Sequence, residues 1–186
     1  MTLDLVVEEL ENRLVREGGG LDDALGLQAI AAIDSDVSGK AWGSLEQALL
    51  MEDSEAQVCV GQALAYTAVS DDEDWEKALE IYGKGASSDS WVVRLGVVQG
   101  LRKAVELNPG VAEDVAVLLG RVLDDGLQVL AGEDVETGPV EDVVRCSVKG
   151  LVEIGQHDSQ LAVDVVSDQG LGGFVMEEFP EGLSTS

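Results

Sequence analysis

The sequence predicts an all-α fold in which pairs of helices stack in a row, and two observations carry this prediction. Four segments can be laid over one another so that a polar position is followed by a small residue and then by Leu or Ile. The polar positions are Gln28, Gln62, Gln99 and Lys149, which are spaced by 34, 37 and 50 residues. Such spacing is typical of stacked helical repeats. Aromatic residues make up only 4% of the chain, so Leu, Val and Ala must build the core, which suits closely packed helices.

Apolar residues at helical spacing, together with helix starts and stops, place the first two pairs. The first pair is expected over residues 1–34, with helices at 2–16 and 21–33 separated by three glycines. Asp34–Gly39 is predicted as a turn. The second pair is expected over 41–70, with a short helix at 45–51 that begins after Ser44 and a second helix at 55–69.

The third pair is expected over residues 72–107, with helices at 74–83 and 91–107. Asn108-Pro109 has the pattern of a helix N-cap followed by proline at the first helical position, and it opens the fourth pair, 109–156. A polar loop over 132–138 accounts for the long last interval. Residues 157–179 are expected to form a capping element and 180–186 a disordered tail, so we expect one domain over 1–179.

The second helix of each pair resembles the corresponding helix of HEAT repeats. The clearest match is Trp91–Leu101, followed by Glu55–Leu64 and then Asp142–Arg145, where the arginine comes one place late. The resemblance covers about residues 1–156 and identifies the chain as a HEAT-like, armadillo-type α-solenoid. It implies a right-handed α-α superhelix of about four helical pairs plus a C-terminal capping helix, with the second helices lining the concave side. Family members mostly bind proteins, some bind nucleic acid, and a few are enzymes.

The chain is strongly acidic, with 37 acidic and 11 basic residues and a net charge of −26. A localised acidic patch would attract a basic partner through its long-range field. Here the acid is spread along the whole chain, which resembles proteins of extreme halophiles. At about 1 M salt the Debye length is about 3 Å, so steering is lost while carboxylate hydration remains. We therefore interpret the acid as a solubility coat for a salt-rich cytoplasm.

Catalytic and metal-binding chemistry find little support in the sequence. The chain has one histidine, His157, at the expected start of a helix, and no glycine-rich loop follows a strand. Asp34–Gly39 fits the first half of a calcium loop, but Leu45 stands where such a loop needs a glutamate. The aligned cysteines Cys59 and Cys146 lie two repeats apart, which is too far for a disulfide. We expect no enzyme, no cofactor and no metal.

The expected partners follow from the charge and the apolar pattern. Phosphate binding needs many uncompensated basic residues, so nucleic acid is not expected. No apolar run reaches the length of a membrane span, and residues 1–10 lack the basic start of a signal peptide. These features predict a cytoplasmic protein that binds another protein or peptide, with a homo- or hetero-oligomer left open.

The basic residues suggest where a partner binds. Arg94, Arg102, Lys103, Arg145 and Lys149, five of the eleven, lie on the second helices of the third and fourth pairs. For Arg94 and Arg145 the resemblance implies pairing with an acid in the adjacent repeat. The leading hypothesis is a non-enzymatic binding or scaffold module whose less acidic inner face holds the partner. The candidate residues are Gln62, Tyr66, Gln99, Lys103 and Lys149.

Two alternatives stay open. The chain could be a structural subunit of a larger cellular or viral assembly, in which the apolar segment 171–179 forms an interface. A metal-dependent enzyme is the weaker alternative.

Overall fold

The computed structural model describes residues 2–17, 19–33, 35–51, 54–70, 72–132 and 138–168, and the regular elements in these ranges are all helical. The helices are α1 (Leu3–Arg16), α2 (Leu21–Ile33), α3 (Ser35–Leu50), α4 (Ser54–Ala65), α5 (Asp72–Ala86), α6 (Trp91–Leu107), α7 (Ala112–Leu130), α8 (Gly138–His157) and α9 (Ser159–Asp168), with single 3₁₀ turns at Tyr66–Val69 (η1) and Pro109–Val111 (η2). The prediction of an all-α fold is confirmed.

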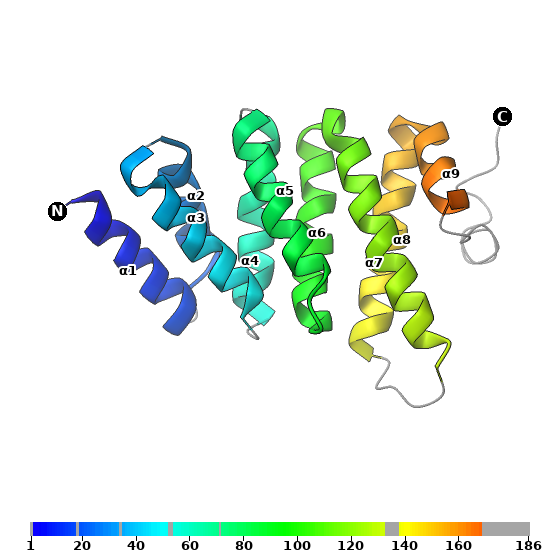
Figure 1. Ribbon diagram of the computed structural model, residues 1–186, viewed down its shortest axis with the longest axis horizontal. Coiled ribbons are helices and arrows are strands. Elements are labelled where there is room, and N and C mark those ends of the chain that lie inside the picture. The colour runs from blue at the N-terminus through cyan, green and yellow to red at the C-terminus, as the bar shows by residue number, and fades with distance from the viewer. Residues whose placement is uncertain are drawn as a thin grey trace.

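The helices form two rows, and α1 and α9 lie at opposite ends of the array (Figure 1). Helices α1, α3, α5 and α7 make one row, and α2, α4, α6 and α8 make the other, which lies behind it in this view. In the second row α4 packs against α2 and α6, and α6 packs against α8. Helices that follow one another in the chain also pack across the rows, most closely α2 with α3 and α7 with α8. Each helix therefore buries its apolar side against neighbours in both directions.

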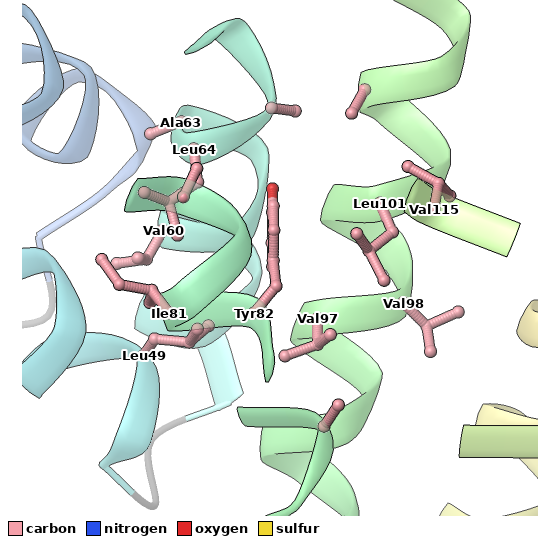
Figure 2. Close-up of a cluster of buried hydrophobic side chains, with 14 of the residues drawn as sticks. Leu49, Val60, Ala63, Leu64, Ile81, Tyr82, Val97, Val98, Leu101 and Val115 are labelled. Carbon is pink, nitrogen blue, oxygen red and sulfur yellow. The ribbon is translucent and has the colours of Figure 1, made fainter. Parts of the chain in front are cut away.

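Tyr82 stands at the centre of the core, between the side chains of Leu64 and Leu101 (Figure 2). The Tyr82 side chain comes from α5 and is fully buried. Its hydroxyl donates a 2.6 Å hydrogen bond to the backbone carbonyl of Gly61 on α4. Burial raises the pKa of Tyr82 well above its ordinary value, because the charged form would lose its hydration. Tyr82 thus ties the first row to the second.

Helices α4 and α6 approach each other backbone to backbone through three glycines, Gly61, Gly96 and Gly100, which we call the glycine seam. A Cβ atom at Gly61 would collide with the carbonyl oxygen of Gly96. A Cβ at Gly100 would lie 2.5 Å from the carbonyl oxygen of Gly61, and one at Gly96 would lie 2.9 Å from that of Gln57. Real Cβ contacts are not this short, so only glycine permits this packing.

The predicted turn at Asp34–Gly39 is wrong, because Ser35 to Gly39 belong to α3. Ser44 does not cap a short helix either. It lies inside α3, where its hydroxyl donates to Glu11 Oε2 at 2.9 Å and to the Lys40 carbonyl at 3.0 Å. The glycines at 39 and 43 suggested a break, but both face solvent. The buried residues Val37, Ala41, Trp42 and Leu45 recur at helical spacing and override the weak propensity of glycine.

The repeat alignment is wrong in its first copy. The alignment places Gln28 with the polar residues Gln62 and Gln99, which predicts that all three point away from the core, yet Gln28 is only 9% exposed. Ala29, aligned with the buried Ala63, is exposed. The buried residues of α2 are Ala24, Leu27, Gln28 and Ala31, which match Val60, Ala63, Leu64 and Thr67 of the second copy at an interval of 36 residues. Gln28 therefore occupies the position that leucine holds in the other copies.

The expected C-terminal cap is only partly within the described residues. Helix α8 continues to His157, and Ser159–Asp168 forms α9, which packs against α7 and α8. The segments 171–179 and 180–186, for which an apolar element and a disordered tail were predicted, lie outside the described residues. None of the described helices is long and apolar enough to cross a membrane.

Candidate binding surface

The second row leaves one side uncovered, namely the side of α2, α4, α6 and α8 that faces away from the first row; we call it the even face. In three of these helices the repeated polar position lies on this face. Gln62 and Gln99 are half-buried and Lys149 is exposed, whereas the two residues that follow each of them are buried. The three side chains therefore lie away from the buried side of α4, α6 and α8.

A hollow of about 500 Å³ opens on the even face. Its walls come from one residue of α4, a stretch of α6 and the part of α8 from Cys146 onward. The lining residues are Gln62, Gln99, Arg102, Lys103, Val105, Glu106, Cys146, Glu153, Gln156 and His157. Three of the five candidate residues, Gln62, Gln99 and Lys103, thus lie together in one depression.

The other two candidates lie on the same face but do not line the hollow. Tyr66 begins η1, one turn after Gln62, and its phenol is near enough to Lys103 to help raise the pKa of that lysine. Lys149 is aligned with Gln99 in the sequence and carries no ion pair within the described part of the chain.

The charged groups in the hollow are already paired with each other. Arg102 on α6 makes a two-pronged contact with the Glu153 carboxylate on α8, with N–O distances of 2.9 and 2.6 Å. Lys103 donates to Glu106 Oε1 at 2.8 Å. Hydrogen bonds to these carboxylates are the main reason why the pKa values of Arg102 and Lys103 are raised. The first contact fixes α6 against α8, and both leave the hollow close to electrically neutral.

Polar groups without a partner remain beside these pairs. The amides of Gln62, Gln99 and Gln156 line the hollow, and none of them makes a side-chain hydrogen bond within the described ranges. Each amide offers two N–H donors and a carbonyl acceptor. The hollow can therefore bind a hydrogen-bonding ligand without first breaking an internal contact.

The two rows differ sharply in charge. Helices α1, α3, α5 and α7 of the first row carry fifteen acidic and six basic residues, whereas α2, α4, α6 and α8 of the second row carry seven acidic and five basic residues. The sequence predicted an inner surface far less acidic than the outer one, and the helices of the second row carry fewer acidic residues than those of the first. Repulsion of an acidic molecule is therefore weakest on the even face.

The two arginines that the resemblance assigned to pairing behave differently. Arg94 donates to Asp125 Oδ2 of α7 at 2.9 Å and lies over the Trp91 ring at 4.3 Å. This contact crosses between helical pairs, as expected. Arg145 instead lies 3.7 Å from Asp142 of its own helix, with 71% of its side chain exposed. The one-residue shift of Arg145 in the motif turns its side chain toward solvent.

Sequence reasoning missed several residues of the hollow. Arg102, Glu153 and Gln156 were not candidates, although Arg102 follows Gln99 by three residues and so shares its helix face. His157 was assigned to a helix start, whereas it is the last residue of α8 and lines the hollow. Cys59 and Cys146 are free and half-buried, and burial is the main cause of the raised pKa of Cys59.

Metal-binding chemistry gains no support from the geometry. Within the described ranges no group of three or more His, Cys, Asp or Glu side chains is placed to hold an ion. The residues Ser35–Gly39 are helical, whereas a calcium loop presents its ligands from a non-helical loop. The described part of the half-motif therefore differs from a calcium loop.

In comparisons with known proteins, no family model, no curated protein and no solved structure matches this chain.

Proposed function

We propose that the protein is a non-enzymatic binding or scaffold module, a HEAT-like solenoid that holds another protein on its even face. The contrast in charge between the two rows is the single observation that carries this proposal. A chain of net charge −26 gains solubility from acid on every exposed helix. The low acid content of α4 and α6 requires a separate reason, and contact with a partner supplies one.

The hollow supports the same assignment. A typical protein interface carries about ten direct hydrogen bonds, and each needs a donor or an acceptor that the partner can reach. Gln62 and Gln99 provide such groups on adjacent helices, and the bridge between Arg102 and Glu153 holds the floor of the hollow in one shape. A preformed surface binds with less loss of conformational entropy.

The proposal is tested by reversing the charge at the centre of the face. A partner is first isolated from the native host in molar salt and purified. We expect Gln99→Glu combined with Lys103→Glu to weaken its affinity about 100-fold, about 1.4 kcal/mol for each substitution. Affinity is measured by calorimetry, and circular dichroism verifies that helicity is kept.

The matched control places the same two changes on the other row. Gln128→Glu and Lys77→Glu lie on α7 and α5, and Lys77, like Lys103, pairs with an acid on its own helix. This control variant has the same net charge as the test variant. We expect it to bind like the unmodified protein. Equal affinity of both variants and the unmodified protein would remove the even face as the binding site.

A further inference from the structure

We infer that the even face accepts an acidic polypeptide surface, one whose Asp and Glu carboxylates meet the basic and amide groups of α4, α6 and α8. This inference rests on the proposed binding function and names the chemistry of the partner. It starts from the positions that carry no acid.

Three segments of the second row, which we call the acid-free segments, contain neither Asp nor Glu: residues 56–65 of α4, 91–105 of α6 and 143–152 of α8. Acidic residues make up 37 of the 186 in the chain, so the absence of any from three helical segments that lie side by side is not explained by composition. The same segments hold five of the eleven basic residues. The acid-free segments are therefore a local reversal of the charge of the protein.

The basic groups differ in how free they are to meet a partner. Arg94 is 11% exposed and engaged with Asp125 of the other row, so it does not belong to the face. Lys149 is exposed and has no ion pair within the described residues, and Arg145 is 71% exposed beside Asp142 at 3.7 Å. Arg102 and Lys103 neutralise Glu153 and Glu106, the acids nearest to the hollow. Lys149 is thus the basic residue of the acid-free segments that has no acidic partner within the described part of the chain.

The side-chain amides of Gln62 and Gln99 also favour an acidic partner. The NH₂ groups of Gln62 and Gln99 have no acceptor within the described part of the chain, and they can donate to carboxylates. Hydrogen bonds to a charged acceptor are about twice as strong as those between neutral groups. An acidic side chain that enters the hollow therefore finds donors on both α4 and α6.

A basic partner would find a better surface elsewhere. The first row and α9 carry seventeen acidic and six basic residues, so a basic molecule is drawn to that side. A nucleic acid would need many uncompensated cations, and of the basic residues in the acid-free segments only Lys149 has no ion pair within the described residues. The acidic polypeptide is the occupant that this arrangement of charge fits.

The inference is tested by NMR titration of the full ¹⁵N-labelled chain with three end-blocked peptides of about 15 residues. They share a Gly-Ser-Ala framework and carry about five Glu, about five Lys or no charged residue. The titration is made at about 0.15 M salt, where the Debye length is about 8 Å, after circular dichroism has verified that the chain keeps its helicity there. We expect the Glu peptide at millimolar concentration to shift the amides around Gln62, Gln99, Lys103 and Lys149. The Lys peptide should shift amides of α1, α5 and α7 instead.

Two variants with the same net charge test whether binding depends on the even face or only on the net charge of the chain. Lys103→Glu with Lys149→Glu reverses one paired and one unpaired lysine of the even face. Lys77→Glu with Arg121→Glu does the same on α5 and α7, because Lys77 pairs with Glu73 and Arg121 has no ion pair within the described residues. We expect the first variant to lose the shifts caused by the Glu peptide and the second to keep them.

The outcomes distinguish this inference from the proposed function. If the Glu peptide shifts no resonance of the even face, or the Lys peptide shifts that face instead, the acidic partner is wrong. The binding function survives that result as long as Gln99→Glu with Lys103→Glu still weakens the native partner. If those two substitutions leave the affinity for the native partner unchanged, the even face is not the binding site. The proposed function is then wrong, whatever the peptides show.

Discussion

Gln57 is a fully buried polar side chain whose nitrogen and oxygen both lack a hydrogen-bond partner within the described residues. It lies in α4, and its backbone carbonyl is the group that a side chain at Gly96 would meet. Burying an amide without hydrogen bonds costs about 1–3 kcal/mol in mutational data. At this residue the protein is therefore less stable than its packing allows.

We predict that Gln57→Met, which keeps the length and flexibility of the side chain, raises the free energy of unfolding by about 1–3 kcal/mol. Urea unfolding followed by circular dichroism measures the change. Gln128→Met on the exposed side of α7 is the control, with an expected change below about 0.5 kcal/mol. A loss of stability in Gln57→Met would show that the amide is satisfied in solution, for example by a buried water.

The burial of individual polar residues could be predicted from the sequence only in part. Gln62, Gln99 and Lys149 could be predicted to point away from the core because each precedes a small residue and a leucine that are buried. Gln28 precedes Ala29 and Ile30 in the same way, yet it is buried. In a helix of small residues the sequence does not show whether a polar residue is buried or exposed. The neighbouring alanine gives no guide, because Ala29 is exposed whereas the aligned Ala63 is buried.

Among the elements, the contact of α4 with α6 depends most on residue size. The glycine seam leaves no room for a methyl group, since the atoms that it would meet are backbone atoms that cannot rotate away. Overpacking of this kind costs about 1–3 kcal/mol and sometimes more. Glycine inside a helix is otherwise unfavourable by about 1 kcal/mol relative to alanine, so the seam reverses the usual preference.

We predict that Gly61→Ala lowers the free energy of unfolding by about 1–3 kcal/mol, because the new Cβ must push α4 away from α6. Gly43→Ala is the matched control. Gly43 also lies inside a helix, is exposed, and has nothing within 4 Å of the position that a methyl group would take, so this change should stabilise by up to about 1 kcal/mol. Thermal unfolding compares the two. Equal effects would mean that the helices separate without cost.

The elements were predicted well where tertiary packing and local signals agree. The helix over 91–107 matches α6 at both ends, because Ser90 and Asn108-Pro109 flank a strong apolar pattern. The start of α3 was missed, because Gly39 and Gly43 are a local signal for a break whereas the burial of Ala41 and Trp42 is a tertiary effect. The hollow could be predicted only in part, since Arg102 and Glu153 meet through the register of α6 against α8.

At the scale of the whole molecule, the acidic side chains repel one another, and salt in the solution screens this repulsion. We propose that this coat is adapted to molar salt, as the resemblance to halophilic proteins implies. In the described structure Arg13, Lys40, Lys77, Lys84, Arg94, Arg102, Lys103 and Arg145 lie in ion pairs. The 37 acidic residues nevertheless outnumber the 11 basic ones, and repulsion among the acidic side chains opposes the compact state.

We predict that helicity at about 222 nm falls when salt is lowered from about 2 M to about 0.01 M, where the Debye length grows to about 30 Å. Sucrose at low salt serves as a control for non-ionic stabilisation. If the loss of helicity comes from unscreened charge, added KCl restores the signal, whereas sucrose of equal osmolality does not. Full helicity in dilute buffer would contradict the prediction.

The glycine seam has a consequence for how this protein can evolve. Helices α4 and α6 meet through carbonyl groups that fit only if Gly61, Gly96 and Gly100 all lack side chains, so a larger residue at one position cannot be compensated by a smaller one at another. Descendants of this chain should keep the three glycines as a set, or lose them together as the helices move apart. If all three glycines are retained together, they would identify related proteins even where the surrounding sequence has diverged too far to be recognised.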